Sequence, residues 1–204
     1  MSRDPRSFAS AEAPPVPVQR GDGAVEAPAD AVLALTIAEL GERPNRIGRL
    51  DESGEHGSYG SLDAVHCAED VFPRRAADGT LPGFLRATLT ALRPGGVLVA
   101  AVPVFREPRP VTAPPRVLRH DGGRELITSM WEWSADGSSY SIDVLRLRKT
   151  GGRWVLVDTA TTVHRVLPAE QVRSLLAEAG FTKVRVSGPA QTGHPVPLWL
   201  GVRP

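Results

Sequence analysis

The sequence predicts an α/β fold in which an antiparallel β-meander is inserted into a largely parallel sheet. We expect a strand over residues 62–68, a helix over 80–92 and a second strand over 97–102 that is apolar on both faces. A strand apolar on both faces is typical of a parallel sheet covered by helices on each side. This strand-helix-strand order therefore predicts a β-α-β unit.

The helix expected over residues 80–92 has leucines at core spacing and a clear end. The segment Arg93-Pro94-Gly95-Gly96 follows it directly. Proline cannot continue the helical hydrogen-bond ladder, and glycine accepts the positive φ common after helices. We therefore expect the chain to turn here and enter the strand over 97–102.

The meander is predicted from three strand-like runs, 125–133, 139–148 and 154–164, joined by Gly-containing hairpin signals. A Pro- and Arg-rich connection, residues 106–122, precedes them. By the period of two along a strand, one face carries a set of four residues. They are Ile127, Ser129, Trp131 and Trp133. We assign residues 106–166 to the meander.

The other expected elements complete a domain over residues 31–204. They are a helix over 31–40 with Asp30 as N-cap and Gly41 as stop, a strand over 45–50, a helix over 168–179 ending at Gly180, and a closing antiparallel pair over 181–186 and 198–202. Residues 1–30 are rich in Pro and Ala and bury too little apolar surface to offset ordering entropy. We expect them to form a mobile tail.

The charge, hydropathy and cysteine content of the chain argue against several classes of function. A net charge of +1 provides no field to attract nucleic acid or an anionic membrane. No apolar run approaches the roughly 20 residues that span a bilayer, and the first residues have no apolar signal-peptide core. The single cysteine, Cys67, cannot form an internal disulfide. We expect a cytoplasmic protein that binds neither nucleic acid nor membrane.

Three segments carry a family resemblance: Leu62-Asp-Ala-Val-His-Cys67, Leu92-Arg-Pro-Gly-Gly96, and the stretch from Leu175 to Arg185. Together they resemble the second half of a class I S-adenosylmethionine-dependent methyltransferase. The meander, followed by Gly193-His-Pro-Val, is similar to the small-molecule subgroup around glycine and sarcosine N-methyltransferases. The resemblance implies a truncated Rossmann-like sheet, S-adenosylmethionine as cofactor, and methyl transfer to nitrogen or oxygen of a small-molecule acceptor.

The chain departs from the family where the glycine-rich cofactor loop is expected. The sole candidate is residues 16–23, and Pro17 suits a central strand poorly because it lacks a ladder N–H. The family's first two strands are likewise not found. The third strand must then pair directly with the fourth, or a partner chain must fill the gap. Because an open strand edge invites association, we consider a homodimer that completes the sheet.

The resemblance also implies cofactor-binding residues. Asp51 lies where the family places an acid at the end of its third strand, and Cys67, Ala68 and Glu69 border the cofactor at the end of the fourth. Asp70 would lie near the acceptor as a catalytic residue, with Arg74 as an acceptor contact. An alternative is that Glu69 and Asp70 are only helix-start acids stabilised by the helix dipole.

Acceptor-side candidates lie mostly on the meander. In the resembled subgroup this region covers the acceptor, and aromatic walls suit a cationic group. His164 is the first candidate proton acceptor, because neutral imidazole is available near pH 7. The remaining candidate contacts are Trp131, Trp133, Tyr140, Arg165 and His194. Core packing is the alternative role for the aromatic residues, and a structural role is the alternative for each histidine. No metal-ligand spacing is present, so we expect no metal.

Three functional hypotheses remain open at the level of sequence. The first is a small-molecule methyltransferase whose cofactor site is eroded or completed by another chain. The second is a catalytically inactive pseudoenzyme or partner subunit of the same ancestry. The third is a cofactor-free enzyme that reuses the pocket for chemistry such as a cyclisation. Fold ancestry alone cannot choose among them.

Overall fold

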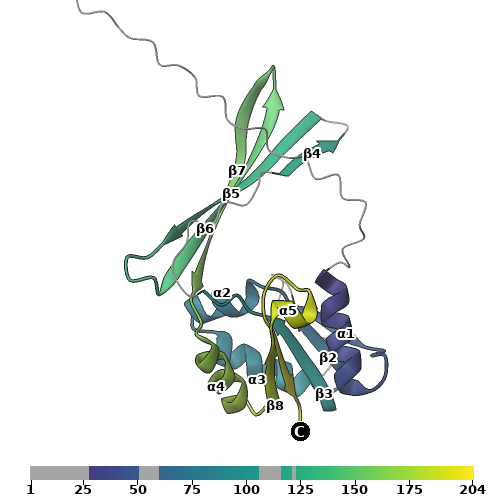
Figure 1. Cartoon of the computed structure of the whole chain (residues 1–204). Coiled ribbons are helices and arrows are strands. Elements are labelled where there is room, and N and C mark those ends of the chain that lie inside the picture. The colour runs from purple at the N-terminus through teal and green to yellow at the C-terminus, as the bar shows by residue number, and fades with distance from the viewer. Residues whose placement is uncertain (1–27, 51–59, 106–115, 121–122) are drawn as a thin grey trace, which may run out of the picture.

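The computed structural model describes residues 28–50, 60–105, 116–120 and 123–204. Two sheets form its framework, one five-stranded and mostly parallel, the other four-stranded and antiparallel (Figure 1). This confirms the predicted α/β class with a β-meander. Most of the expected tail, the candidate loop at residues 16–23, and Asp51 lie outside the described residues.

The five-stranded sheet has the order β1-β2-β3-β9-β8. Its strands are β1 (Ile47–Leu50), β2 (Leu62–Cys67), β3 (Leu92–Ala101), β9 (Leu198–Val202) and β8 (Thr182–Ser187). The first three run parallel, whereas β9 is antiparallel to both β3 and β8. β1 pairs directly with β2, with Ile47 opposite Ala64, so no further strand separates them.

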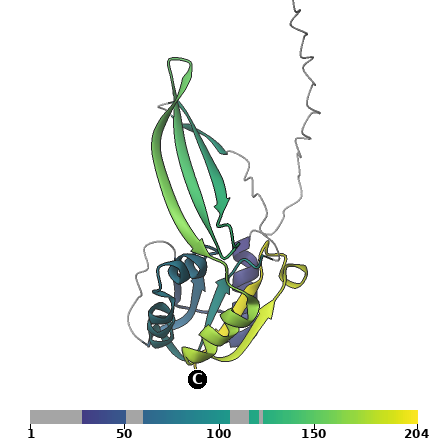
Figure 2. The ribbon, with the colours of Figure 1, turned by 90° about the vertical axis from the view of Figure 1, so that its left-hand side faces the viewer.

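Helices cover both faces of this sheet, which explains why residues 97–101 of β3 are continuously apolar and buried (Figures 1 and 2). One face packs on α1 (Pro28–Leu40). The opposite face packs on α2 (Val71–Ala77), α3 (Leu81–Ala91) and α4 (Ala169–Glu178). His66 and Cys67 point to opposite faces: the Nε2 atom of His66 lies 2.8 Å from Thr36 Oγ1 on α1, and Cys67 lies in the other core.

The start of α1 and the presence of two short helices differ from the sequence-based expectation. α1 begins at Pro28, so Asp30 lies inside its first turn and is not the N-cap. Proline is well suited to a first turn because its fixed φ is helical and its missing N–H is not needed there. The short helices α2 and α5 (Pro189–Thr192) were not predicted as elements, because each has seven or fewer residues and gives little periodicity.

The segment Leu92-Arg-Pro-Gly-Gly96 opens β3, so the strand begins five residues earlier than predicted. Gly95 has φ of +74°, which favours glycine. A Cβ on Gly96 would lie 2.8 Å from Arg93 O, 3.0 Å from Leu62 O and 3.1 Å from Asp63 O. The second glycine is therefore required by close backbone approach between β3 and β2.

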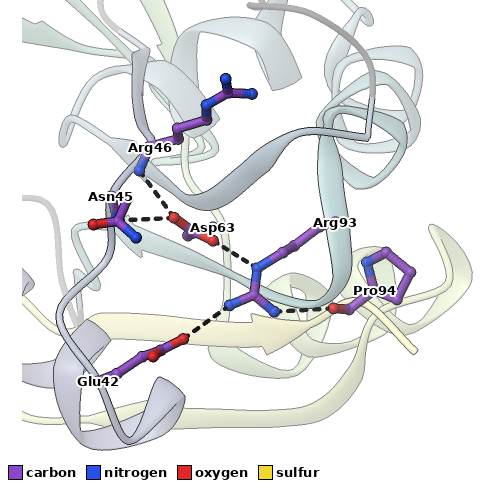
Figure 3. A network of polar contacts seen from close by, with 6 residues as sticks. All are labelled: Glu42, Asn45, Arg46, Asp63, Arg93 and Pro94. Carbon is purple, nitrogen blue, oxygen red and sulfur yellow. Dashed lines mark hydrogen bonds and ion pairs between the residues drawn. The ribbon is translucent and has the colours of Figure 1, made fainter.

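An ion-pair network fixes the amino-terminal end of β2 (Figure 3). Asp63 Oδ1 accepts a 2.6 Å bond from Arg93 Nε, and Asp63 Oδ2 accepts bonds from the backbone N–H groups of Asn45 and Arg46 at 2.8 and 2.9 Å. Arg93 also lies 3.6 Å from Glu42. The Arg93 bond and the two backbone bonds hold the pKa of Asp63 below its ordinary value. This network links the segment that follows α1 to the first residues of β2 and β3.

The meander contains four strands, not three: β4 (Arg116–His120), β5 (Gly123–Trp133), β6 (Ser139–Thr150) and β7 (Arg153–Arg165). β4 falls in the segment predicted as an irregular connection. Neighbouring strands pair in sequence order, and the sheet extends away from the helices of the α/β layer (Figure 2). No helix among the described residues is long and apolar enough to cross a bilayer.

Candidate functional site

The candidate site lies where β2 ends and the meander meets the α/β layer. Ala68, Glu69 and Asp70 follow β2 directly and lead into α2, which contacts β7. In parallel sheets, ligands bind outside the carboxyl ends of the strands. This edge is therefore the expected place for chemistry, and the meander brings a second set of side chains to it.

Five rings form a continuous cluster beside this edge. The Tyr140 ring stacks on Trp131 with centroids 4.9 Å apart and on His164 with centroids 4.9 Å apart. Trp133 lies 5.1 Å from Tyr140, and Phe105 meets Trp131, Trp133 and Tyr140 edge to face at 6.4, 5.0 and 5.4 Å. Four of these five residues were predicted from the sequence as site residues, and the structure brings those four together.

His164 is buried at the inner end of this cluster, with 2% of its surface exposed. Its Nδ1 atom is buried and has no hydrogen-bond partner among the described residues. Burial lowers the pKa of His164; the nearby Asp70 carboxylate opposes that shift, and Arg74 adds to it. The imidazole is therefore neutral near pH 7, and Nδ1 is a polar atom without a protein partner.

Asp70 and Arg74 face this cluster from α2. Their side chains form an i,i+4 ion pair of 3.5 Å, and both are partly buried. Burial raises the pKa of Tyr140, and the Asp70 and Glu69 carboxylates raise it further, which places both acids near the phenol. Asp70 precedes α2 but makes no side-chain cap bond, so its charge faces the meander and does not cap the helix.

The expected cofactor-bordering residues differ in exposure. Ala68 and Glu69 are exposed at the carboxyl edge of β2. Cys67 is 4% exposed and packs in the apolar core beneath α2, and burial raises its thiol pKa strongly. The Cys67 side chain is therefore not available at that edge. A buried thiol with a raised pKa is unreactive, so we assign it no nucleophilic role.

Two predicted acceptor residues are not joined to the cluster. His194 lies between α5 and β9, where its Nδ1 is 2.9 Å from Val196 O. Arg165 ends β7 with an exposed side chain. The ring contacts described above include neither residue. The bond to Val196 indicates that His194 fixes its own loop.

Phe105 is the site residue that sequence analysis missed. It follows β3 by four residues and makes edge-to-face contacts with three rings of the cluster. A residue just past the carboxyl end of a parallel strand is well placed for a site, and this position could have drawn attention to it. Its partners lie on β5 and β6, a pairing that local sequence pattern does not reveal.

An open pocket of about 250 Å³ lies around the turn between β5 and β6. Its lining includes the cluster residues Trp133 and Tyr140. The other lining residues are Glu132, Ser134, Ser139, Ser141 and Val163. The serine hydroxyls and the one carboxylate of this lining can contact a hydroxylated small molecule. In the described part of the chain, no three His, Cys, Asp or Glu side chains gather as metal ligands.

Comparisons with known proteins support the fold. No protein-family model matches the sequence, and no curated protein matches it. Among solved structures, the sugar N-methyltransferase KedS8 from Streptoalloteichus superposes with a TM-score of 0.67 at 17% identity, covering 100% of this chain and 98% of that one. The chain therefore has the Rossmann-like fold of S-adenosylmethionine-dependent methyltransferases.

Two further structures are similar over the same architecture. SAM-bound CalS10, an amino pentose methyltransferase from Micromonospora echinaspora, gives a TM-score of 0.56 at 17% identity over 76% of this chain and 63% of that chain. DesVI from Streptomyces venezuelae gives 0.57 at 16% identity over 76% and 64%. The matched region thus spans less than two thirds of CalS10 and of DesVI.

Proposed function

We propose that this protein is an S-adenosylmethionine-dependent methyltransferase that acts on a nitrogen or oxygen atom of a small molecule. One observation carries the proposal: the ring cluster ending in the buried, neutral His164 lies beside the carboxyl edge of β2. Similarity to KedS8, described as a sugar N-methyltransferase, and to CalS10, an amino pentose methyltransferase, supports it.

The residues at this edge fit part of the cofactor. The Glu69 side chain is exposed beside the end of β2, where a carboxylate can accept bonds from ribose hydroxyls. Ala68 leaves the neighbouring backbone accessible. The described ranges contain no glycine-rich turn leading from a strand into a helix, and Asp51 lies outside them. When bound, S-adenosylmethionine would supply an electrophilic methyl group on a good leaving group.

The protein's own contribution would be to hold the acceptor and accept a proton. Methyl transfer requires alignment of the nucleophile, which the flat walls of Trp131 and Tyr140 can provide. A cationic amine would also be attracted to these rings. The unpartnered Nδ1 of neutral His164 can accept the proton that an ammonium or hydroxyl group loses, and the Asp70 carboxylate would stabilise the resulting imidazolium.

A direct assay tests this proposal. The purified chain is incubated with S-adenosylmethionine and a panel of amino sugars and small amines, and S-adenosylhomocysteine is quantified. We expect turnover with at least one amine and a loss of 10²-fold or more in His164→Asn, on the order of a general-base contribution. The matched control is His194→Asn, which we expect to retain activity. Equal activity in both variants would remove the assigned role of His164.

Two alternative functions follow from the lack of a glycine-rich turn in the described ranges. A pseudoenzyme or partner subunit would keep the ring cluster only as packing. A cofactor-free enzyme would keep the pocket and use His164 on its own substrate. Failure to bind S-adenosylhomocysteine would favour these alternatives, and ligand-induced quenching of Trp131 and Trp133 fluorescence by a small molecule would then favour the second of them.

We also retain the proposal that another chain associates at the edge of the five-stranded sheet. β1 is the last strand on its side within the described residues, and it has only four residues. A second copy or a partner strand adding there would satisfy its outer N–H and C=O groups. Direct pairing of β1 with β2 means that such a partner would extend the sheet and would not fill a gap inside it.

A further inference from the structure

The meander has two faces, and the one turned away from the ring cluster carries a row of aliphatic residues across all four strands. Residues alternate between faces along each strand. Trp131, Tyr140 and His164 share one face. We call the opposite face the open face. Its residues on β4 and β5 are Val117, Arg124, Leu126, Thr128, Met130 and Glu132. Its residues on β6 and β7 are Ser141, Asp143, Leu145, Leu147, Lys149, Trp154, Leu156, Thr159, Thr161 and Val163.

An apolar stripe crosses the whole width of the open face. Val117 pairs with Leu126, Leu126 with Leu147, and Leu147 with Leu156, so four aliphatic side chains stand side by side on four strands. Val117 is 54% exposed and Leu156 is 51% exposed. No helix lies over this distal part of the sheet (Figures 1 and 2). Leu126 and Leu147, the inner members, are partly buried, and an apolar stripe with exposed ends is a candidate interaction surface.

Charge on the open face is separated along the strands. Towards the α/β layer lie two acids, Asp143 and Glu132. Beyond the stripe, towards the β6–β7 hairpin, lie two cations, Arg124 and Lys149. Asp143 accepts a 2.6 Å bond from Thr161, and none of the other three forms an ion pair among the described residues. Moving along the strands away from the α/β layer, the open face is therefore first acidic, then apolar and then basic.

We propose that the open face binds a second copy of this chain. A two-fold axis that lies in the interface plane, runs across the strands and passes between the Leu145 and Leu147 rows would lay the Leu147 row of each copy on the Leu145 row of the other. The same rotation brings Asp143 of each copy opposite the partner's Lys149. Such an isologous contact is self-complementary, because one end of each patch is acidic and the other basic. An unrelated apolar partner would not need this arrangement.

The size of the face is adequate for a specific dimer. Four strands at about 4.8 Å spacing are roughly 19 Å wide, and the rows from Glu132 to Arg124 cover about 27 Å along the strand. Two copies would therefore bury on the order of 1,000 Å², at the lower limit for specific interfaces. We thus expect association at micromolar concentration, independent of whether the chain transfers methyl groups.

Adjacent residues on β7 offer a matched pair of variants. Leu156 lies on the open face at 51% exposure, and Val155 lies on the other face at 52% exposure, opposite Arg148. Light scattering after size exclusion should give twice 21.8 kDa for the full chain and for Val155→Glu, and 21.8 kDa for Leu156→Glu. A monomeric native chain, or a dimer that survives in Leu156→Glu, would overturn the proposal. The latter result would favour association at β1.

A charge-reversal experiment identifies the partner as a second copy in the stated orientation. Asp143→Lys and Lys149→Glu should each weaken the homodimer at least tenfold through like-charge contacts. An equimolar mixture of the two variants should restore a dimer, because every contact across the axis then joins opposite charges. No recovery in the mixture, with both variants shown by circular dichroism to be folded, would contradict the two-fold arrangement.

Discussion

The Tyr140 ring lies parallel to the His164 imidazole, at an interplanar angle of 7° and a centroid separation of 4.9 Å. The two residues are register partners on β6 and β7, so the hydrogen-bonded ladder itself sets their stacking. Since Tyr140 also stacks on Trp131, the imidazole forms the inner end of an aromatic wall. The proposed proton acceptor and the proposed acceptor-binding rings are therefore parts of one sheet.

Burial of His164 predicts a dependence of stability on pH. The folded-state pKa is lowered, whereas the unfolded imidazole titrates near about 6.5. Between these two pKa values the unfolded chain binds more protons than the folded chain, so the unfolding free energy increases with pH. It therefore decreases as the pH drops below about 6.5. His164→Phe keeps a ring against Tyr140 without titrating. We expect its Tm to fall less between about pH 7.5 and pH 5 than that of the native chain. Equal falls would contradict this account.

The Asp63–Arg93 pair should contribute measurably to stability. Asp63 is 15% exposed in its side chain and accepts three bonds, so Asp63→Asn should cost about 1–2 kcal/mol of unfolding free energy in urea at pH 7. The matched control is Asp158→Asn, whose partner Arg146 lies 3.5 Å away with both side chains largely exposed; we expect less than about 0.5 kcal/mol.

The pH dependence of the Asp63 effect has a defined sign. The pKa of Asp63 is lowered in the folded state, so its contribution is present above about pH 4 and is lost as the pH falls through the folded value. The unfolding free energies of the native chain and of Asp63→Asn should therefore converge in acid. A difference that persists unchanged at low pH would show that the charge of Asp63 is not the cause.

The two glycines that open β3 should differ in their tolerance of alanine. Alanine at Gly95 should cost about 1–2 kcal/mol of unfolding free energy, because φ there is +74°. Steric contact adds nothing, since no atom lies closer than 3.9 Å to the added Cβ. At Gly96 three backbone oxygens lie within 3.1 Å of an added Cβ, and two of them, Leu62 O and Asp63 O, belong to β2 and cannot move without separating β2 from β3. We expect Gly96→Ala to lower Tm more than Gly95→Ala in differential scanning calorimetry. The reverse order would contradict the geometric explanation.

Exposure of Glu69 predicts its effect on cofactor affinity. If its carboxylate accepts ribose hydroxyl bonds, Glu69→Gln should weaken S-adenosylhomocysteine binding about tenfold, the value of one charge-assisted hydrogen bond. Glu178→Gln, at an exposed position on the far end of α4, is the control and should bind like the native chain. Equal affinity of both variants would leave Glu69 as a solvent-exposed acid without a binding role.

Sequence pattern predicted the elements that have strong periodicity or clear ends. The β-α-β unit followed from the apolar run over 97–102, and the hairpins followed from their turn residues. β4 was missed because its five residues, Arg116–His120, follow a Pro-rich stretch and are paired only through β5. The start of α1 at Pro28 was missed because Asp30 is also a good capping residue.

The sequence indicated individual residues of the candidate site, but it did not indicate how these residues come together in space. Trp131 and Trp133 share a face by the period of two, and the structure confirms that both contact Tyr140. The contribution of Phe105 depends on how the meander folds back over the end of β3, which no local pattern specifies. Burial of Cys67 likewise depends on α2, a helix too short to be recognised in advance.

Titration calorimetry of the full chain with S-adenosylhomocysteine tests the central claim most directly. We predict one site per chain with a dissociation constant in the micromolar range, near −8 kcal/mol as an order-of-magnitude value. Absence of heat, together with no thermal shift at millimolar ligand, would contradict the methyltransferase proposal. The ring cluster around His164 would then have to serve a cofactor-free reaction or packing alone.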